Sequence, residues 1–99
     1  MSSVHVLALV FDLHIGHAQS LKDKRAVVRP LVERVSRSWR VSVAEVGHQD
    51  LLQRSEIAIA IVSGDVARAE SLADEIDRFM YDQLGFEVAE RRRWWSSEE

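Results

Sequence analysis

The sequence lacks cysteine altogether and has one proline and four glycines among its 99 residues. The absence of cysteine excludes disulfide frameworks, cysteine-based zinc or iron–sulfur sites and thiol nucleophiles. Long apolar runs are also missing, because the longest, at 6–11 and 57–62, are of strand length. A membrane helix needs roughly 20 such residues. No secretory pattern opens the chain, so we expect a cytoplasmic protein without membrane contact.

Neither sign of charge dominates the chain, which has 13 Lys and Arg against 16 Asp and Glu and a formal net charge of −3. This balance argues against a protein that is basic throughout, such as a histone-like nucleic-acid coat, but it leaves room for a local basic patch. The 46% hydrophobic content argues against disorder. We expect a single domain over 1–99, with 96–99 as a frayed tail.

Hydrophobic periodicity predicts four strands and two helices. The strands are expected at 4–15, 41–47, 56–63 and 86–94. The helices are expected at 20–38 and 65–84, with Ser20 and Asp65 as N-caps and Gly85 ending the second helix. The residues expected to face the core from the first strand and the first helix are Leu7, Leu9, Phe11, Leu13, Ile15, Leu21, Val28, Leu31, Val32 and Val35.

This order of elements predicts an α+β fold, the ferredoxin-like βαββαβ sandwich. Right-handed crossovers give an antiparallel sheet of strand order 4-1-3-2 with both helices on one face. The segments 14–25, 48–54 and 82–86 then lie together at one pole of the sheet.

Two local features leave alternatives open. Pro30 lies inside the first predicted helix, where it predicts a kink near 26–30 or an earlier break. In the strand at 41–47, Glu45 shares a face with Val41 and Val43, so the inward face is undecided. A bulge near Glu45 would resolve this conflict.

Three motifs resemble those of a known family: Ser20-Leu21-Lys22-Asp23-Lys24-Arg25, Val41-Ser42-Val43-Ala44-Glu45-Val46 and His48-Gln49-Asp50-Leu51-Leu52-Gln53-Arg54. The sequence resembles the YlxP-like family of small bacterial proteins, a domain of unknown function numbered 503, over essentially its whole length. The resemblance implies a ferredoxin-like cytosolic protein without established catalytic residues. It also implies a link to translation or ribosome maturation, because genes of the family often neighbour those of translation initiation factor two and ribosome-binding factor A. Pro30 departs from the family's usual helix former.

The motif at 20–25 opens the first helix, where free backbone N–H groups and the helix dipole favour an anion. Lys22, Lys24, Arg25 and Arg29 are therefore candidate residues for binding an anion or RNA. Helical angles point Lys24 toward the core and Lys22 and Arg25 away from it. The structural alternative is that Lys24 pairs internally with a carboxylate such as Asp50 or Glu45, while the others form a solvated face.

A second candidate cluster at the same pole is polar and consists of His14, His17, His48, Asp50 and Arg54. Its histidines, with Asp12 and Asp50, offer the nitrogen and carboxylate ligands that suit zinc or iron. No known metal-site spacing is present, however, and the strand order separates His14 from His48 by about 10 Å. We therefore predict no metal site and no cofactor, with His14 as an ordinary surface residue and His48 as a turn residue.

The C-terminal strand has a basic and aromatic cluster, Arg91, Arg92, Arg93 and Trp94, followed by Trp95. Such a cluster either grips nucleic acid or protects an edge strand with charge. The sheet face without helices is expected to be apolar, through Val6, Ala8, Val10, Ala58, Ala60 and Val62. Because its central strands lack aromatic residues, base stacking of the RNA-recognition-motif type is not expected. The patch predicts a homodimer through this face, or a partner that covers it.

No catalytic constellation is evident, since Gly-rich phosphate loops, nucleophile elbows and paired carboxylates are missing. Charge is polarised between the helices: 20–40 contains seven Lys and Arg against two Asp and Glu, whereas 65–84 contains two against six. The leading hypothesis is a non-catalytic accessory factor that contacts structured RNA or a ribosomal subunit through the basic helix. A homodimeric module that binds a protein or small anion is the alternative, and a metal-dependent enzyme is a weaker one.

Overall fold

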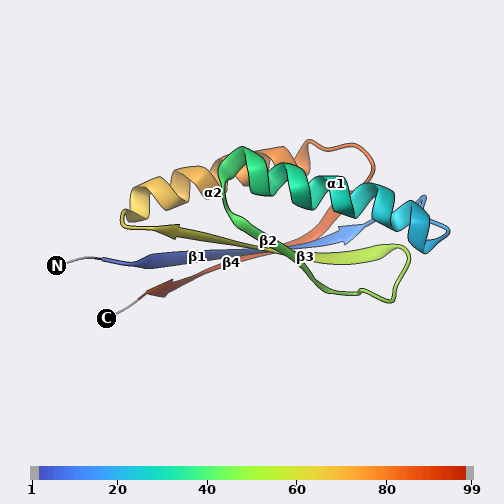
Figure 1. The fold of residues 1–99 in the computed structure, drawn as a ribbon, viewed down its shortest axis with the longest axis horizontal. Coiled ribbons are helices and arrows are strands. Elements are labelled where there is room, and N and C mark those ends of the chain that lie inside the picture. Colours follow the sequence, from blue (N-terminus) through green and yellow to red (C-terminus); the bar gives the residue numbers. More distant parts are fainter. Residues whose placement is uncertain (1–2, 98–99) are drawn as a thin grey trace.

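A computed structural model describes residues 3–97. Its elements follow the predicted order: β1 (His5–His14), α1 (Leu21–Trp39), β2 (Ser42–Gly47), β3 (Arg54–Ser63), α2 (Val66–Tyr81) and β4 (Glu87–Ser97). Both helices lie on one face of the sheet, and within residues 3–97 no helix or strand lies on the other (Figure 1). This arrangement confirms the predicted ferredoxin-like α+β fold.

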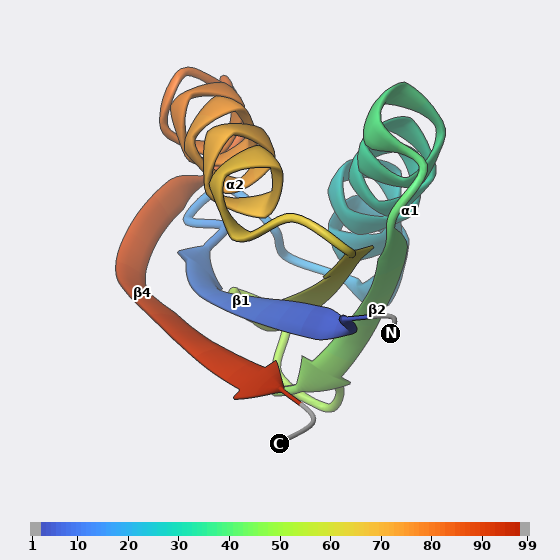
Figure 2. The same ribbon diagram turned by 90° about the vertical axis from the view of Figure 1, so that its left-hand side faces the viewer.

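The four strands form one sheet in the order β2-β3-β1-β4, which is the predicted order read from the other edge. Every pairing is antiparallel. Seen end-on, the sheet is twisted, with α1 above the β2 side and α2 above the β4 side (Figure 2). The edges of the sheet are therefore β2, under the basic helix, and β4, under the acidic one.

Strand alternation in β1 divides its residues between the two faces as predicted. The odd-numbered residues from Leu7 to Leu13 are buried beneath the helices. They pack with Ile57, Ile59 and Ile61 of β3 and with Val28, Leu31 and Val35 of α1. Leu21 was expected in this core but is 43% exposed, because it occupies the first turn of α1.

Helix α1 begins at its predicted N-cap, where Ser20 Oγ accepts a hydrogen bond from the Asp23 backbone N–H at 3.0 Å. The Asp23 carboxylate accepts one in turn from the N–H of Gln19, at 3.0 Å. The helix then continues through Pro30 to Trp39, so the earlier break, one of the two alternatives considered for Pro30, does not occur.

A bulge in β2 settles which residues of that strand face inward. The register between β2 and β3 shifts between Glu45 and Gly47, which leaves Val46 as the extra residue, 51% exposed. Val43 packs against the core, and Glu45 shares its face. The bulge predicted near Glu45 is confirmed, and it follows a carboxylate that lies on the helix side of the sheet.

The ends of the last two elements differ from the prediction. Helix α2 ends at Tyr81 with Asp82 as its C-cap, and Gly85, whose φ is +98°, lies in the following loop. Strand β4 continues to Ser97, because Ser96 pairs with Val6 of β1. Ser96 and Ser97 therefore belong to the sheet and not to a frayed tail, while 98–99 lie outside the described residues.

Candidate functional site

The motif at the start of α1 lies at a pole of the sheet where two loops are bonded together. The backbone N–H of Ile15 donates to the Gln53 carbonyl at 2.8 Å. The Gln53 side-chain amide donates to the carbonyls of Gly16 and Ala18, each at 3.2 Å. These bonds hold the loop that precedes α1 against the loop that precedes β3, and so fix the position of the N-terminus of α1.

Lys24 is buried at this pole, with its side chain only 4% exposed. Its Nζ donates to the carbonyls of His48 at 2.7 Å and Leu51 at 2.8 Å, with the Gln49 carbonyl at 3.4 Å. It also lies 3.1 Å from Glu45 Oε2. An ammonium group has three protons, so these contacts leave none for an external phosphate. These contacts favour the alternative in which Lys24 pairs internally, and they identify Glu45 as its carboxylate partner.

Glu45 connects this lysine to the interior of the sheet. Its Oε2 accepts a hydrogen bond from the hydroxyl of Ser55 at 2.7 Å, and Ser55 is fully buried. A carboxylate with both a cation and a hydroxyl donor is compensated for its partial loss of water. The sequence analysis missed Ser55, although a serine at a core-facing position of an otherwise apolar strand signals a buried polar network.

Three of the other five cations of α1 point to solvent and form a stripe, which we call the α1 stripe: Lys22, Arg25 and Arg29. Their spacing of three and four residues places them on one side of the helix. All three are exposed, and within residues 3–97 none of them forms an ion pair. From the first to the third, the stripe spans about 10 Å of helix axis.

Two adjoining hollows border the α1 stripe along the edge strand β2. One, of about 310 Å³, is lined by residues that include Arg25, Arg29 and Asp50. The other, of about 470 Å³, includes Arg29, Arg37 and Val43. Arg37 differs from the stripe residues because its guanidinium pairs with Glu33. Arg34, which has no ion pair within residues 3–97, lies instead over the Phe79 ring at 5.2 Å. The three unpaired cations that share one side of α1 therefore lie in its N-terminal half.

The polar residues predicted as a second cluster are divided among three places. Arg54 forms two hydrogen bonds with the Asp12 carboxylate, at 2.7 and 3.3 Å, and His48 Nε2 lies 3.7 Å from the same carboxylate. His14 and His17 instead line a hollow of about 510 Å³ beside the loop before β4. Asp50 lies in the groove beside α1. The five residues do not converge on one ligand.

One group of side chains has suitable spacing for a metal ion, and it includes a residue that the sequence analysis did not name. Asp12, His48 and Glu56 place ligand atoms within 4.8 Å of one another. The Asp12 carboxylate is already paired with Arg54, and Arg92 Nη2 lies 3.7 Å from the Glu56 carboxylate. The Asp12 hydrogen bond, and then its charge, raise the pKa of Arg54, so the guanidinium stays charged. These two arginines supply the positive charge that the carboxylates require.

The C-terminal basic cluster is neutralised by neighbouring carboxylates. Arg93 pairs with Asp74 at 3.2 Å and with Asp77 at 2.9 Å, and Arg91 lies 3.4 Å from Asp77. On the other face of the strand, the Arg92 guanidinium lies 5.6 Å from the centre of the Trp94 ring. The structure therefore favours the alternative in which these charges protect and anchor an edge strand.

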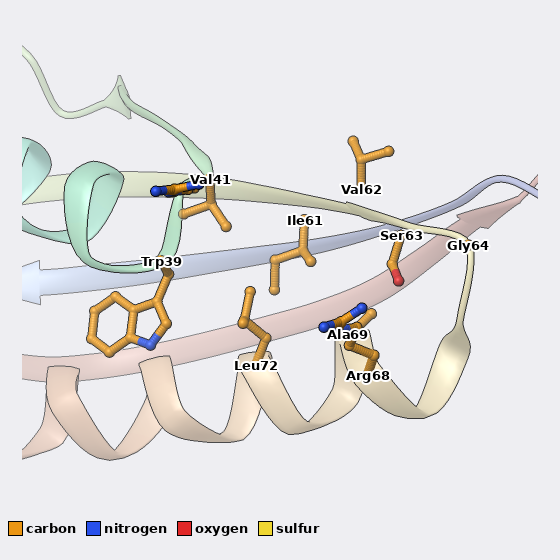
Figure 3. A pocket seen from close by; sticks show the side chains of 10 residues that line it. Trp39, Val41, Ile61, Val62, Ser63, Gly64, Arg68, Ala69 and Leu72 are labelled. Carbon is orange, nitrogen blue, oxygen red and sulfur yellow. The ribbon is translucent and has the colours of Figure 1, made fainter.

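A further hollow, of about 350 Å³, lies at the opposite pole and was not anticipated (Figure 3). It lies between the end of α1 and the start of α2, with Ile61, Val41 and Leu72 among its apolar lining. Arg40 and Arg68 border it, both exposed and, among the described residues, without an ion pair. Arg40 extends the unpaired positive charge of α1 to its C-terminal end.

Comparison with known proteins places this fold in a family. The sequence profile described as "Protein of unknown function (DUF503)" matches residues 6–93. The chain belongs to the DUF503 family. It is also 38% identical over 66 residues to the "Uncharacterized protein YlxP" of Bacillus subtilis (strain 168), a match that covers 67% of this chain and 72% of that protein. DUF503 membership confirms the resemblance stated from the motifs.

Neither helix of the described DUF503 chain has the length and apolarity needed to cross a membrane. Helix α1, the longer of the two, has 19 residues but contains six lysines and arginines. Its features indicate a helix that packs one face on the sheet and exposes a charged face.

Proposed function

We propose that this protein is a non-catalytic, cytoplasmic accessory factor that contacts the phosphate backbone of structured RNA through the α1 stripe. The observation that supports this most directly is the stripe itself: Lys22, Arg25 and Arg29 are exposed and lack carboxylate partners within the described chain. Phosphate contacts of this kind position a protein on RNA without reading its sequence.

The layout of the stripe favours a polymer over a small anion. Three cations spread over about 10 Å of one helix side cannot all reach a single phosphate, but they match successive phosphates of a backbone. Lys24 is the one cation of the motif that points inward, and it forms an ion pair with Glu45 and hydrogen bonds to the carbonyls of the loop at 48–51. It holds the loop at 48–51 against α1 and so supports the position of the stripe.

Charge polarity between the two helices gives the complex an orientation. Helix α2 contributes Asp74 and Asp77, which neutralise Arg91 and Arg93 at the far edge of the sheet. The same helix also exposes Glu70 and Glu75, which form no ion pair among the described residues. RNA is therefore attracted to the α1 side and repelled from the α2 side. A lack of catalysis is supported by the ion pairs at Asp12 and Glu56, whose carboxylates are engaged by arginines.

We further propose that the target is ribosomal RNA, in a free subunit or a maturing one. This part of the proposal depends on the gene neighbourhood of the family. In a cell lysate, the protein should co-sediment with ribosomal subunits and leave them at raised salt, because phosphate contacts weaken as salt rises. Co-sedimentation that survives high salt would contradict an electrostatic contact.

A binding experiment with a matched control tests the role of the stripe. The variant Lys22→Gln, Arg25→Gln, Arg29→Gln removes three unpaired cations, whereas Arg91→Gln, Arg92→Gln, Arg93→Gln removes three paired ones, so the change in net charge is identical. Fluorescence anisotropy with a labelled RNA hairpin at low salt should show at least a tenfold loss of affinity for the first variant and about threefold or less for the second. Equal losses, or no binding by the wild type, would exclude the proposal.

A further inference from the structure

We propose that a second copy of this chain covers the sheet face without helices, with Trp94 of each copy packed into a hollow of the other. Trp94 is on that face because it pairs directly with Ala8, whose neighbours Leu7 and Leu9 point to the core. Trp94 is 47% exposed, and Val62 on the same face is 70% exposed. Within residues 3–97 no helix and no second layer of strands lies over this face (Figure 1), although the Arg92 guanidinium lies 5.6 Å from the centre of the Trp94 ring.

The hollow, which we call the alanine hollow, has a volume of about 250 Å³ and lies beside Trp94. Apart from Val10 and Trp94 of the same chain, its lining on the exposed face is small: Ala8, Ala44, Ala58, Ala60 and Ser42. Three adjacent strands contribute these residues at matching register positions, since Ala60 pairs with both Ala8 and Ser42. The face therefore combines a projecting indole on β4 with a shallow apolar depression that extends to β2.

In a symmetric pair these two features meet each other twice. In a two-fold interface the same surface meets itself, so one chain must provide both the projecting group and the depression. Trp94 and Ala44 are on the same face of the sheet but on its two opposite edge strands, β4 and β2. A two-fold axis parallel to the strands superposes β4 of each copy on β2 of the other, which seats each indole on the partner's alanines.

The chemistry of the face favours a protein surface over RNA. The side chains of the alanine hollow offer one hydroxyl and no cation. In the next rows of the same face, Asp12 and Glu56 are paired with Arg54 and Arg92, and Glu90 adds a further carboxylate, so these rows offer phosphate no unpaired cation. The indole and the alanines instead gain by exclusion of water.

The dimensions of the face match a dimer of modest affinity. Three strands of 10 or 11 residues and the six-residue β2, about 4.8 Å apart, cover roughly 570 Å² of flat area, somewhat below the 800 Å² per partner of a standard interface. Because the helices lie on the opposite face, both α1 stripes of such a dimer point outward. The dimer and the proposed RNA contact therefore use separate surfaces.

Sedimentation equilibrium from about 1 to about 100 µM tests the proposal, with two adjacent tryptophans as a matched pair. Trp95 pairs with Leu7 and thus projects from the helix side of β4. We expect a wild-type dimer whose Kd rises at least about thirtyfold in Trp94→Ala and stays within about threefold in Trp95→Ala. Ala60→Glu, which places a charge in the alanine hollow, should be monomeric with an unchanged circular dichroism spectrum.

Two results would overturn the dimer. One is a wild-type chain that stays monomeric up to about 100 µM. If Trp94→Ala also weakened RNA binding by this monomer, the face would bind nucleic acid and not a second copy. The other is a dimer that Trp94→Ala and Trp95→Ala affect equally, because its interface would then lie elsewhere. Neither result would change the expected effect of the stripe variant on RNA, so the two proposals fail independently.

Discussion

Lys24 and Glu45 form an ion pair in which Nζ and Oε2 are 3.1 Å apart and the lysine side chain is almost fully buried. Lys22, two residues earlier in the same turn, is exposed and without a partner in the described chain. The helical turn 22–25 thus contains one buried cation, Lys24, and two that are exposed to solvent, Lys22 and Arg25. This division distinguishes the residues that stabilise the pole of the sheet from those that are free to bind.

Replacement of Lys24 by methionine should destabilise the protein by about 3 kcal/mol. The substitution leaves Glu45 and two carbonyl groups without their cation, and removing one partner of a buried pair typically costs about 3–5 kcal/mol. Urea unfolding followed by circular dichroism measures the change. Lys22→Met is the control and should cost less than about 0.5 kcal/mol. If both variants lost the same stability, the lysine would not have the role assigned to it.

Pro30→Ala should increase the free energy of unfolding by about 1–2 kcal/mol. Pro30 lies exposed within a continuous helix, where proline lacks the N–H that would bond to the preceding turn and costs about 3 kcal/mol. Part of this gain is lost because alanine makes the unfolded chain less restricted. A variant less stable than the wild type in urea would show that α1 requires the shape that proline gives it.

Arg93→Ala should cost about 1–2 kcal/mol of stability. Arg93 contacts both Asp74 and Asp77, and the side chain of Asp77 is only 17% exposed. Arg92→Ala is the comparison, because Arg92 is 52% exposed and 3.7 Å from its carboxylate partner. Its loss should cost less than about 1 kcal/mol. Thermal unfolding distinguishes the two, and a larger effect for Arg92 would reverse the assignment.

EDTA should leave the unfolding midpoint unchanged, and added Zn²⁺ should not raise it. Asp12 and Glu56 are already neutralised by Arg54 and Arg92, so an ion would have to displace a guanidinium group. A ligand that binds only the folded state raises its stability in proportion to RT ln(1 + [L]/Kd). A midpoint that falls with EDTA and recovers with one equivalent of metal would establish a metal site at Asp12, His48 and Glu56.

Much of the fold could be predicted because its signals are local. Alternation in β1, the N-caps Ser20 and Asp65 and the helical spacing in α1 each depend on residues a few positions apart. The end of β4 could not be predicted in this way, since Ser96 and Ser97 pair with Val6 and His5 at the other end of the chain. Their polar side chains resemble those of a tail, and only the long strand β1 makes them part of the sheet.

The candidate site could be predicted less completely. Helical angles predicted that Lys24 points toward the core while Lys22 and Arg25 point away from it. They did not decide whether Glu45 or Asp50 is the carboxylate partner of Lys24. The choice of Glu45 over Asp50 depends on the bulge at Val46 and on the positive φ of His48, 59°, which together set the path of the following loop. Strand alternation predicts that Arg91 and Arg93 lie on one face of β4 and Arg92 on the other. The partners of Arg91 and Arg93 on α2 could be identified only from the packed structure.

The salt dependence of RNA binding tests the central claim most directly. The slope of log Kobs against log salt concentration measures how many phosphates the protein neutralises, at about 0.7–0.9 per contact. With a labelled RNA hairpin, Lys22→Gln, Arg25→Gln, Arg29→Gln should reduce the magnitude of this slope by about 2–3 relative to the wild type. The matched triple replacement of Arg91, Arg92 and Arg93 should leave the slope unchanged. A wild-type slope near zero, or a slope unchanged in the stripe variant, would contradict the account.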